Sequence, residues 1–179
     1  GLTLGSQQAI NIDFAGGERI GVFAENATLI ISKFIYFQGA IGFQKVNFAA
    51  GDLYNSNNVA LGKTTGFSIG GSGIDAFVGY AENGFDKTKT LTEQKDGLYG
   101  FGVEDVDFAY LNVTDSVSKI QYDSLRVDVA NVELFGFNPE DFELSFKNSQ
   151  ILYNASSQEG LGLDLSGDRA LTIPTGGDD

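Results

Sequence analysis

The chain lacks histidine, cysteine, methionine and tryptophan, and it has only 2 prolines among 179 residues. Without histidine it lacks the side chain that titrates nearest neutral pH and the commonest metal ligand. Without cysteine it cannot form disulfides, thiolate nucleophiles or the usual structural zinc sites. Because oxidisable residues are a liability outside the cell, the missing methionine and tryptophan also favour an oxidation-exposed, extracellular setting.

Acidic residues outnumber basic ones by 24 to 11, which gives a formal net charge of −13. Nucleic-acid binding needs clustered Lys and Arg, so this composition counts against it. The same surplus makes divalent cations plausible counterions. We expect no membrane insertion, because Ser32 and Lys33 interrupt the longest apolar stretch, 27–37. A chain that starts Gly-Leu-Thr-Leu, without Met or a signal peptide, is expected to be a processed or excised fragment.

One pattern recurs along the chain: apolar residues alternate, a polar or glycine step of two or more residues follows, and alternation resumes. It occupies 67–69 and 74–78, then 103 and 106–110, then 127–129 and 132–134. Alternation indicates a half-buried strand, since successive side chains point to opposite faces. The step restores the apolar set to the inward face after a bend or bulge.

Strand signals run from end to end, and we expect almost no helix beyond one turn near 91–96. Residues 28–37 and 39–48 read as two strands, or as one long strand bent at 38–39. Polar composition predicts loops at 50–65 and 81–96, the second the longest exposed loop. A proline predicts a turn at 138–141. The remaining expected strands are 9–14, strand pairs in 99–113, 122–137 and 142–153, and short strands at 161–165 and 170–173.

Irregular spacing of a recurring motif has two interpretations in an all-β chain. One is a β-solenoid of stacked strand-bend-strand coils, with long insertions leaving one corner. The other is an antiparallel β-sandwich with bulged strands. Apolar residues at matching positions, with Gly, Asn, Asp and Ser at the corners, favour the solenoid. We expect a single all-β repeat domain over 1–174 and a flexible acidic tail at 175–179.

These segments also carry a family resemblance. The matching stretches, in order along the chain, are 28–43, 73–79, 102–111, 129–136 and 142–154. Together they resemble a repeat found in very large secreted bacterial surface proteins. Such proteins are of the haemolysin-type, calcium-binding or adhesin-like kind. The resemblance implies an extracellular or cell-surface structural repeat, with no catalytic residues to carry over. Family repeats are usually embedded in far longer chains. The partners it implies are therefore neighbouring repeats of a longer chain or further copies of this one.

Carboxylates beside glycine make the C-terminal region the first candidate for calcium. Asp164 and Asp168 flank a Leu-Ser-Gly turn, and Asp178 and Asp179 follow two glycines. Calcium prefers several such oxygens in a tight turn. The alternative is that these are solvated turn acids, because a complete ligand set is rare.

A weaker candidate cation site is the acidic step of the recurring pattern, formed by Glu104, Asp105 and Asp107. Paired carboxylates can also cleave glycosides when they flank a sugar. Here Asp105 and Asp107 are expected to share a strand face, and nothing predicts a cleft, so an outward polar face is the simpler interpretation.

The sequence therefore predicts a non-catalytic, extracellular structural module of a bacterial surface adhesin or fibre. Assembly is expected through exposed strand edges, which pair with further copies into a filament, with calcium as a stabilising ion. A third class, a hydrolase or lyase, would need a groove with convergent carboxylates and a basic residue.

The alternative is a carbohydrate-binding β module, with surface glycans as partners. It needs aromatic side chains in solvent on one sheet face; the candidates are Tyr36, Tyr80, Tyr99, Tyr110 and Tyr122. Three Asn-x-Ser/Thr sequons would carry sugars on a secreted eukaryotic or archaeal protein; they begin at Asn26, Asn112 and Asn154.

Overall fold

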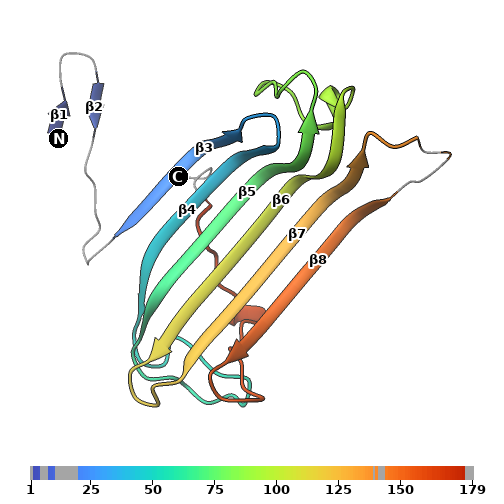
Figure 1. The fold of residues 1–179 in the computed structure, drawn as a ribbon. Coiled ribbons are helices and arrows are strands. Elements are labelled where there is room, and N and C mark those ends of the chain that lie inside the picture. Colours follow the sequence, from blue (N-terminus) through green and yellow to red (C-terminus); the bar gives the residue numbers. More distant parts are fainter. Residues whose placement is uncertain (1, 5–7, 11–19, 139, 141–143, 176–179) are drawn as a thin grey trace.

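A computed structural model describes residues 2–4, 8–10, 20–138, 140 and 144–175 (Figure 1). Two short strands, β1 (Leu2–Leu4) and β2 (Gln8–Ile10), pair antiparallel. The rest of the described strands form one six-stranded sheet: β3 (Gly21–Ile31), β4 (Ile35–Phe48), β5 (Thr64–Ala81), β6 (Leu98–Asp115), β7 (Gln121–Phe135) and β8 (Ser145–Ser156).

The sheet is an antiparallel meander, because spatial order follows chain order from β3 to β8. Figure 1 shows it open, with β3 and β8 as its two edges. In the described residues the helical elements are two single 3-10 turns, Thr92–Gln94 and Gly167–Arg169. The all-β class, the near absence of helix and the one turn expected near 91–96 are confirmed.

The recurring steps lie inside long strands, and this corrects several predicted boundaries. The segments 99–113 and 122–137, expected as strand pairs, fall mainly in the single strands β6 and β7. The first hairpin turns at Ser32, which has φ 54°, whereas 38–39 is a bend within the single strand β4, where the register with β5 shifts between Gln38 and Ala40. Gly39 lies within β4, where an added Cβ would approach Ile74 Cγ1 to 2.6 Å, so glycine there serves close packing.

Other predicted elements differ at the C-terminal end. The expected strand at 161–165 reduces to a single bridge between Asn55 and Leu163, and 170–173 forms no strand. Residue 142, where the last strand pair was to begin, lies outside the described residues. So do most of the expected strand at 9–14, half of the turn at 138–141 and nearly all of the acidic tail.

The register defines two faces, because residues directly opposite on neighbouring antiparallel strands point to the same side. We call the first the covered face, since the segments 49–63, 82–97 and 157–175 pack on it. The last of these runs across the sheet in Figure 1. We call the opposite side the open face.

The covered face has two separate cores, one at each end of the strands. At one end Leu111, Val113 and Tyr122 pack against the buried residues Leu53, Leu61, Leu161 and Leu163 of the two flanking segments. At the other end Tyr36, Phe77, Ala81, Leu98 and Phe135 enclose Leu91 of the 82–97 loop. Leu91 is 0% exposed, so this loop, predicted from its polarity to be exposed, is anchored to the sheet.

A row of bulges crosses the middle of the sheet. Positive φ angles at Gly73, Asp105 and Asn148 mark it in β5, β6 and β8, and the β3–β4 register shifts between Ala24 and Ala27. The bulges reset the alternation of side chains. Ser72 reaches the covered face, where its hydroxyl lies 3.0 Å from that of Thr175.

Beyond the bulge of β5 the apolar residues return to their own sides. Ile74 lies on the open face, since a Cβ on the open-face Gly71 would touch both Ile74 and Phe108. Phe77 then returns to the covered face. The bulges thus keep the alternating apolar residues on one side, as predicted for the step.

Candidate interaction surface

Most of the exposed large apolar side chains of the described chain lie on the open face. On the two central strands Val78 is 63% exposed and Phe101, directly opposite it, is 43% exposed. Further exposed members on the outer strands and strand ends are Val22, Leu29, Ile31, Phe43, Tyr80, Tyr99, Phe146, Ile151 and Tyr153. Within the described residues both buried hydrophobic clusters lie on the covered face. Because large exposed apolar patches are typical of interaction sites, the open face is the candidate interaction surface.

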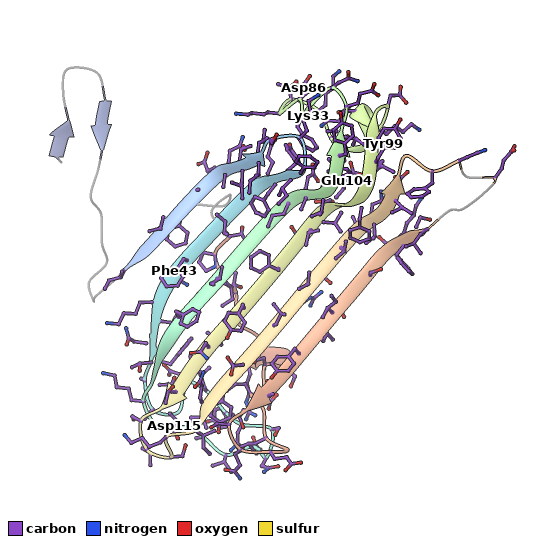
Figure 2. All side chains as sticks on the ribbon, in the orientation of Figure 1. Lys33, Phe43, Asp86, Tyr99, Glu104 and Asp115 are labelled. Atoms are coloured by element: carbon purple, nitrogen blue, oxygen red, sulfur yellow. The ribbon has the colours of Figure 1, made fainter. Side chains whose placement is uncertain are left out.

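Aromatic rings form a short row on one half of the open face. The ring centroids of Phe43 and Phe67 are 5.7 Å apart, and those of Phe67 and Tyr110 are 5.8 Å apart. Tyr110 donates to Asp123 at 2.6 Å, and this bond raises the pKa of its hydroxyl. Figure 2 labels Phe43 near the left edge of the sheet and Tyr99 near its upper end.

The residues that sequence alternation marks as inward belong to this open face. Cross-strand pairing places Ile69 beside Tyr110, Val103 beside Val132, and Val106 beside Val129. The periodicity that predicts a buried side therefore describes the side that the described chain leaves uncovered.

The five tyrosines proposed as a sugar platform do not share one environment. Tyr36 and Tyr122 are each 1% exposed and belong to the two cores of the covered face. Tyr80 and Tyr99 are exposed and lie opposite each other on the open face, and Tyr110 is half-buried in the aromatic row. The rings of Phe43 and Phe67 complete that row, and the parity of their positions in the alternating strands is the signal that could have identified them.

The acidic step of β6 stabilises the bulges. The Asp105 amide donates to Asp75 Oδ1 at 3.0 Å, and the Gly73 amide donates to Asp107 Oδ1 at 3.0 Å. Each bulged residue of β5 or β6 thus has its N–H bound by a carboxylate of the neighbouring strand. Glu104 instead accepts the Thr92 amide at 2.8 Å, which fastens the 82–97 loop. The bonds of Asp75 and Asp107 satisfy N–H groups that the bulges remove from the strand ladder.

Asp75 gives a prediction for the pH dependence of stability. Burial, together with the charges of Glu104 and Asp105, raises the pKa of Asp75 although the Asp105 N–H lowers it. With a raised folded pKa, deprotonation favours the unfolded state, so stability falls as pH rises from the ordinary value of 3.8 to the raised one. Asp75→Asn keeps an oxygen acceptor without the charge. We expect it to flatten this fall and to leave neutral-pH stability equal or higher.

The matched control is Asp75→Ala, which also removes the acceptor. It should cost about 1–2 kcal/mol at neutral pH, because the Asp105 N–H loses its partner. Urea unfolding at several pH values, followed by far-UV circular dichroism, measures both variants. A pH profile unchanged by Asp75→Asn would contradict the assignment.

The C-terminal acids lie apart from those of the β6 step. Arg169 pairs with Asp164 and stacks its guanidinium 3.9 Å from the Tyr54 ring centroid. Hydrogen bonds from Ser166 and Arg169 lower the pKa of Asp164. Asp168 belongs to the exposed turn Gly167–Arg169. Asp178 and Asp179, the other expected calcium ligands, lie outside the described residues. In the part of the chain that is described, no three His, Cys, Asp or Glu residues gather as a metal site.

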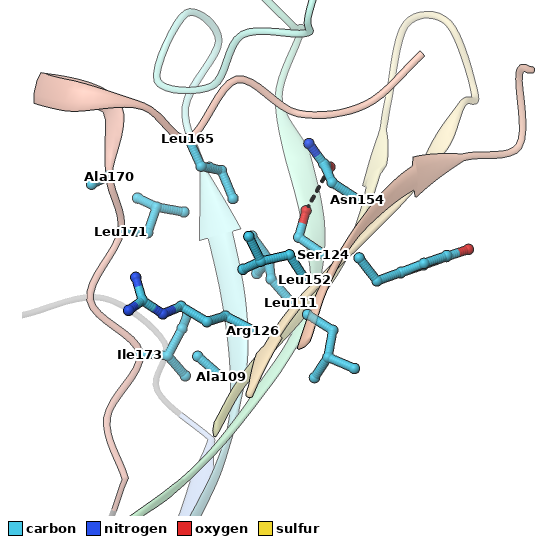
Figure 3. A pocket seen from close by; sticks show the side chains of 12 residues that line it. Ala109, Leu111, Ser124, Arg126, Leu152, Asn154, Leu165, Ala170, Leu171 and Ile173 are labelled. Atoms are coloured by element: carbon cyan, nitrogen blue, oxygen red, sulfur yellow. Dashed lines mark hydrogen bonds between the residues drawn. The ribbon is translucent and has the colours of Figure 1, made fainter. Parts of the chain in front are cut away.

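A cavity of about 500 Å³ lies between the C-terminal segment and strands β6–β8 (Figure 3). Its lining is largely apolar and includes Leu111, Leu152, Leu171 and Ile173. The one charged group in the lining, Arg126, is bound at 2.6 Å to Asp128. We therefore interpret the cavity as loose packing between the irregular C-terminal segment and the sheet. Its lining contains no carboxylates.

The edges β3 and β8 are the second feature available for interaction. Each pairs on one side only among the described strands. A strand edge offers N–H and C=O groups to a further strand.

No protein-family model, curated protein or solved structure matches this chain. Among the described residues no helix is both long and apolar enough to cross a membrane. The resemblance to giant surface-protein repeats stays a prediction.

Proposed function

We propose that the chain is a non-catalytic structural module of an extracellular bacterial surface adhesin or fibre, which assembles by pairing β8 of one copy with β3 of the next. The observation that carries the proposal is the geometry of the two edges. The lack of histidine and cysteine and the structural use of the β6 acids support a role without catalysis.

The number of strands favours open-ended addition. In a six-stranded antiparallel meander the first and last strands run in opposite directions. A second copy placed alongside by translation therefore presents β3 antiparallel to β8, and the sheet continues. A head-to-tail contact of this kind does not close on itself and generates a filament.

The bulge row is also compatible with such pairing. One row of cross-strand partners runs from Ala24 to Ile151, and another runs from Leu29 to Phe146. The two rows are five residues apart in the sequence of β3 and also five residues apart in that of β8. The two edges can therefore pair across the bulge without a register shift, which would otherwise turn side chains to the wrong face.

Engineered cysteines test the edge pairing, and the cysteine-free chain makes the result unambiguous. Phe23 and Leu152 lie in one cross-strand row on the covered face, at opposite edges, and are 40% and 68% exposed. We expect Phe23→Cys with Leu152→Cys to give a ladder of disulfide-linked oligomers on mild oxidation, seen by non-reducing electrophoresis.

The matched control pairs Phe23→Cys with Ser145→Cys, which lies at the other end of β8. Its sulfurs would sit about 23 Å apart along the strand, far beyond disulfide reach. Equal ladders from both variants, or strictly monomeric wild-type chain in light scattering with and without calcium, would contradict the proposal.

The choice between solenoid and sandwich and the role of calcium are part of the same proposal. Translation of the sheet would give the stacked continuity of a solenoid, and a second layer on the open face would give a sandwich. Calcium is proposed as a counterion that moderates repulsion between copies carrying −13 each. Aromatic stacking of Phe43, Phe67 and Tyr110 favours a glycan platform as the second candidate function.

A further inference from the structure

We infer that the open face binds the open face of a second copy of this chain, so that two sheets form one sandwich related by a two-fold axis parallel to the strands. This inference rests on the proposed structural function and names a second contact of the same module. Edge pairing extends a sheet, whereas this contact buries it.

The available area suits a stable dimer. Six strands spaced about 4.8 Å apart give a face about 29 Å wide, and β4, with 14 residues, is about 46 Å long. The face therefore measures roughly 1,300 Å², and contact over half of it by each copy buries about 1,300 Å² in total. Specific interfaces bury about 1,200 Å² or more.

Charge on the open face fits a second copy better than an unrelated apolar surface. Outside the bulges, the register places two charged strand residues on this face, Lys45 of β4 and Asp123 of β7. Both lie in one cross-strand row, which runs from Lys45 through Phe67 and Asn112 to Asp123.

A two-fold axis between β5 and β6 brings these charges together. Such an axis places β4 of one copy over β7 of the other while keeping the level along the strands. Lys45 then faces Asp123 of the second copy, and the reverse contact repeats it, as an isologous interface requires. The same axis sets Val78 opposite Phe101 of the second copy, a small side chain against a large one, as facing sheets pack.

Reversing the charge of Lys45 or of Asp123 tests this arrangement, and mixing the two variants should restore the dimer. Lys45→Glu would set two carboxylates face to face in each contact, and Asp123→Lys would set two ammonium groups face to face. We expect each variant alone to dimerise at least tenfold more weakly than the wild type. An equimolar mixture should recover dimers, because both contacts in the heterodimer join opposite charges. Sedimentation equilibrium at about 0.15 M salt measures all three.

A charged substitution at an apolar position of the open face tests whether this face is buried in the dimer. Val78→Asp buries a carboxylate only in the sandwich, so it should abolish the dimer and leave the monomer folded. Val117→Asp makes the same change at a turn position that is 78% exposed, and should leave the dimer intact. Thermal melts followed by far-UV circular dichroism confirm folding in each case.

The outcomes separate the two contacts. If Val78→Asp removes closed dimers while the Phe23→Cys and Leu152→Cys ladder persists, both proposals stand. If the ladder fails while mixing rescues the reversed charges, only edge pairing is wrong. A monomeric wild type, dimers insensitive to Val78→Asp, or a mixture without rescue overturns the sandwich, as does a monomer that binds oligosaccharide or vesicles through Phe67.

Discussion

Gly66→Ala is expected to destabilise the sheet by about 3 kcal/mol or more, the cost of overpacking a site that cannot yield. A Cβ at Gly66 of β5 would lie 1.8 Å from the carbonyl oxygen of Asn112 in β6. The obstacle is backbone, so no rotamer change relieves it. The two central strands would have to separate at this point. Urea unfolding followed by far-UV circular dichroism measures the loss.

Gly73→Asn is the matched control in the same strand. Gly73 has φ 55°, a region that Asn tolerates better than most residues, and an added Cβ meets nothing within 4 Å. We expect a cost below about 1 kcal/mol. If both variants lost similar stability, glycine content would matter through chain entropy and not through the close approach of β5 and β6.

The alternating segments predicted the strands well because alternation is a local property of the backbone. They also predicted which residues share a side, since Val103, Val106, Val129 and Val132 do lie together on the open face. What they could not reveal is which side the chain itself covers. That depends on the segments 49–63, 82–97 and 157–175, which are irregular and carry no periodicity.

The sequence also carries no signal for the covered face, for a further physical reason. In β5 its residues next to the C-terminal segment are small, and a Cβ on Gly70 would lie 2.4 Å from the Pro174 carbonyl oxygen. Close backbone packing thus replaces large apolar side chains, and no amphipathic signal remains. Leu91 is similar, because a single buried leucine in a polar loop leaves no pattern. The acids of β6 were found, but their role follows from bulges whose pairing is non-local.

Phe77→Ala and Phe101→Ala should separate folding from assembly. Phe77 is 1% exposed, and its ring lies 5.5 Å from that of Phe85 and 6.0 Å from that of Phe135. Its truncation leaves a cavity under the 82–97 loop, so we expect a loss of about 4 kcal/mol at every protein concentration. Thermal melts over a dilution series measure it.

Phe101 is the counterpart on the open face, opposite Val78 in the neighbouring strand. In the single chain it is 43% exposed, so Phe101→Ala should cost less than about 1 kcal/mol when dilute. In the sandwich the same ring is buried, and the melting temperature of the variant should fall further behind the wild type as concentration rises, since association stabilises only the parent. A concentration-independent difference for Phe101→Ala would mean that this face stays in solvent, and the apolar alternation would then require another explanation.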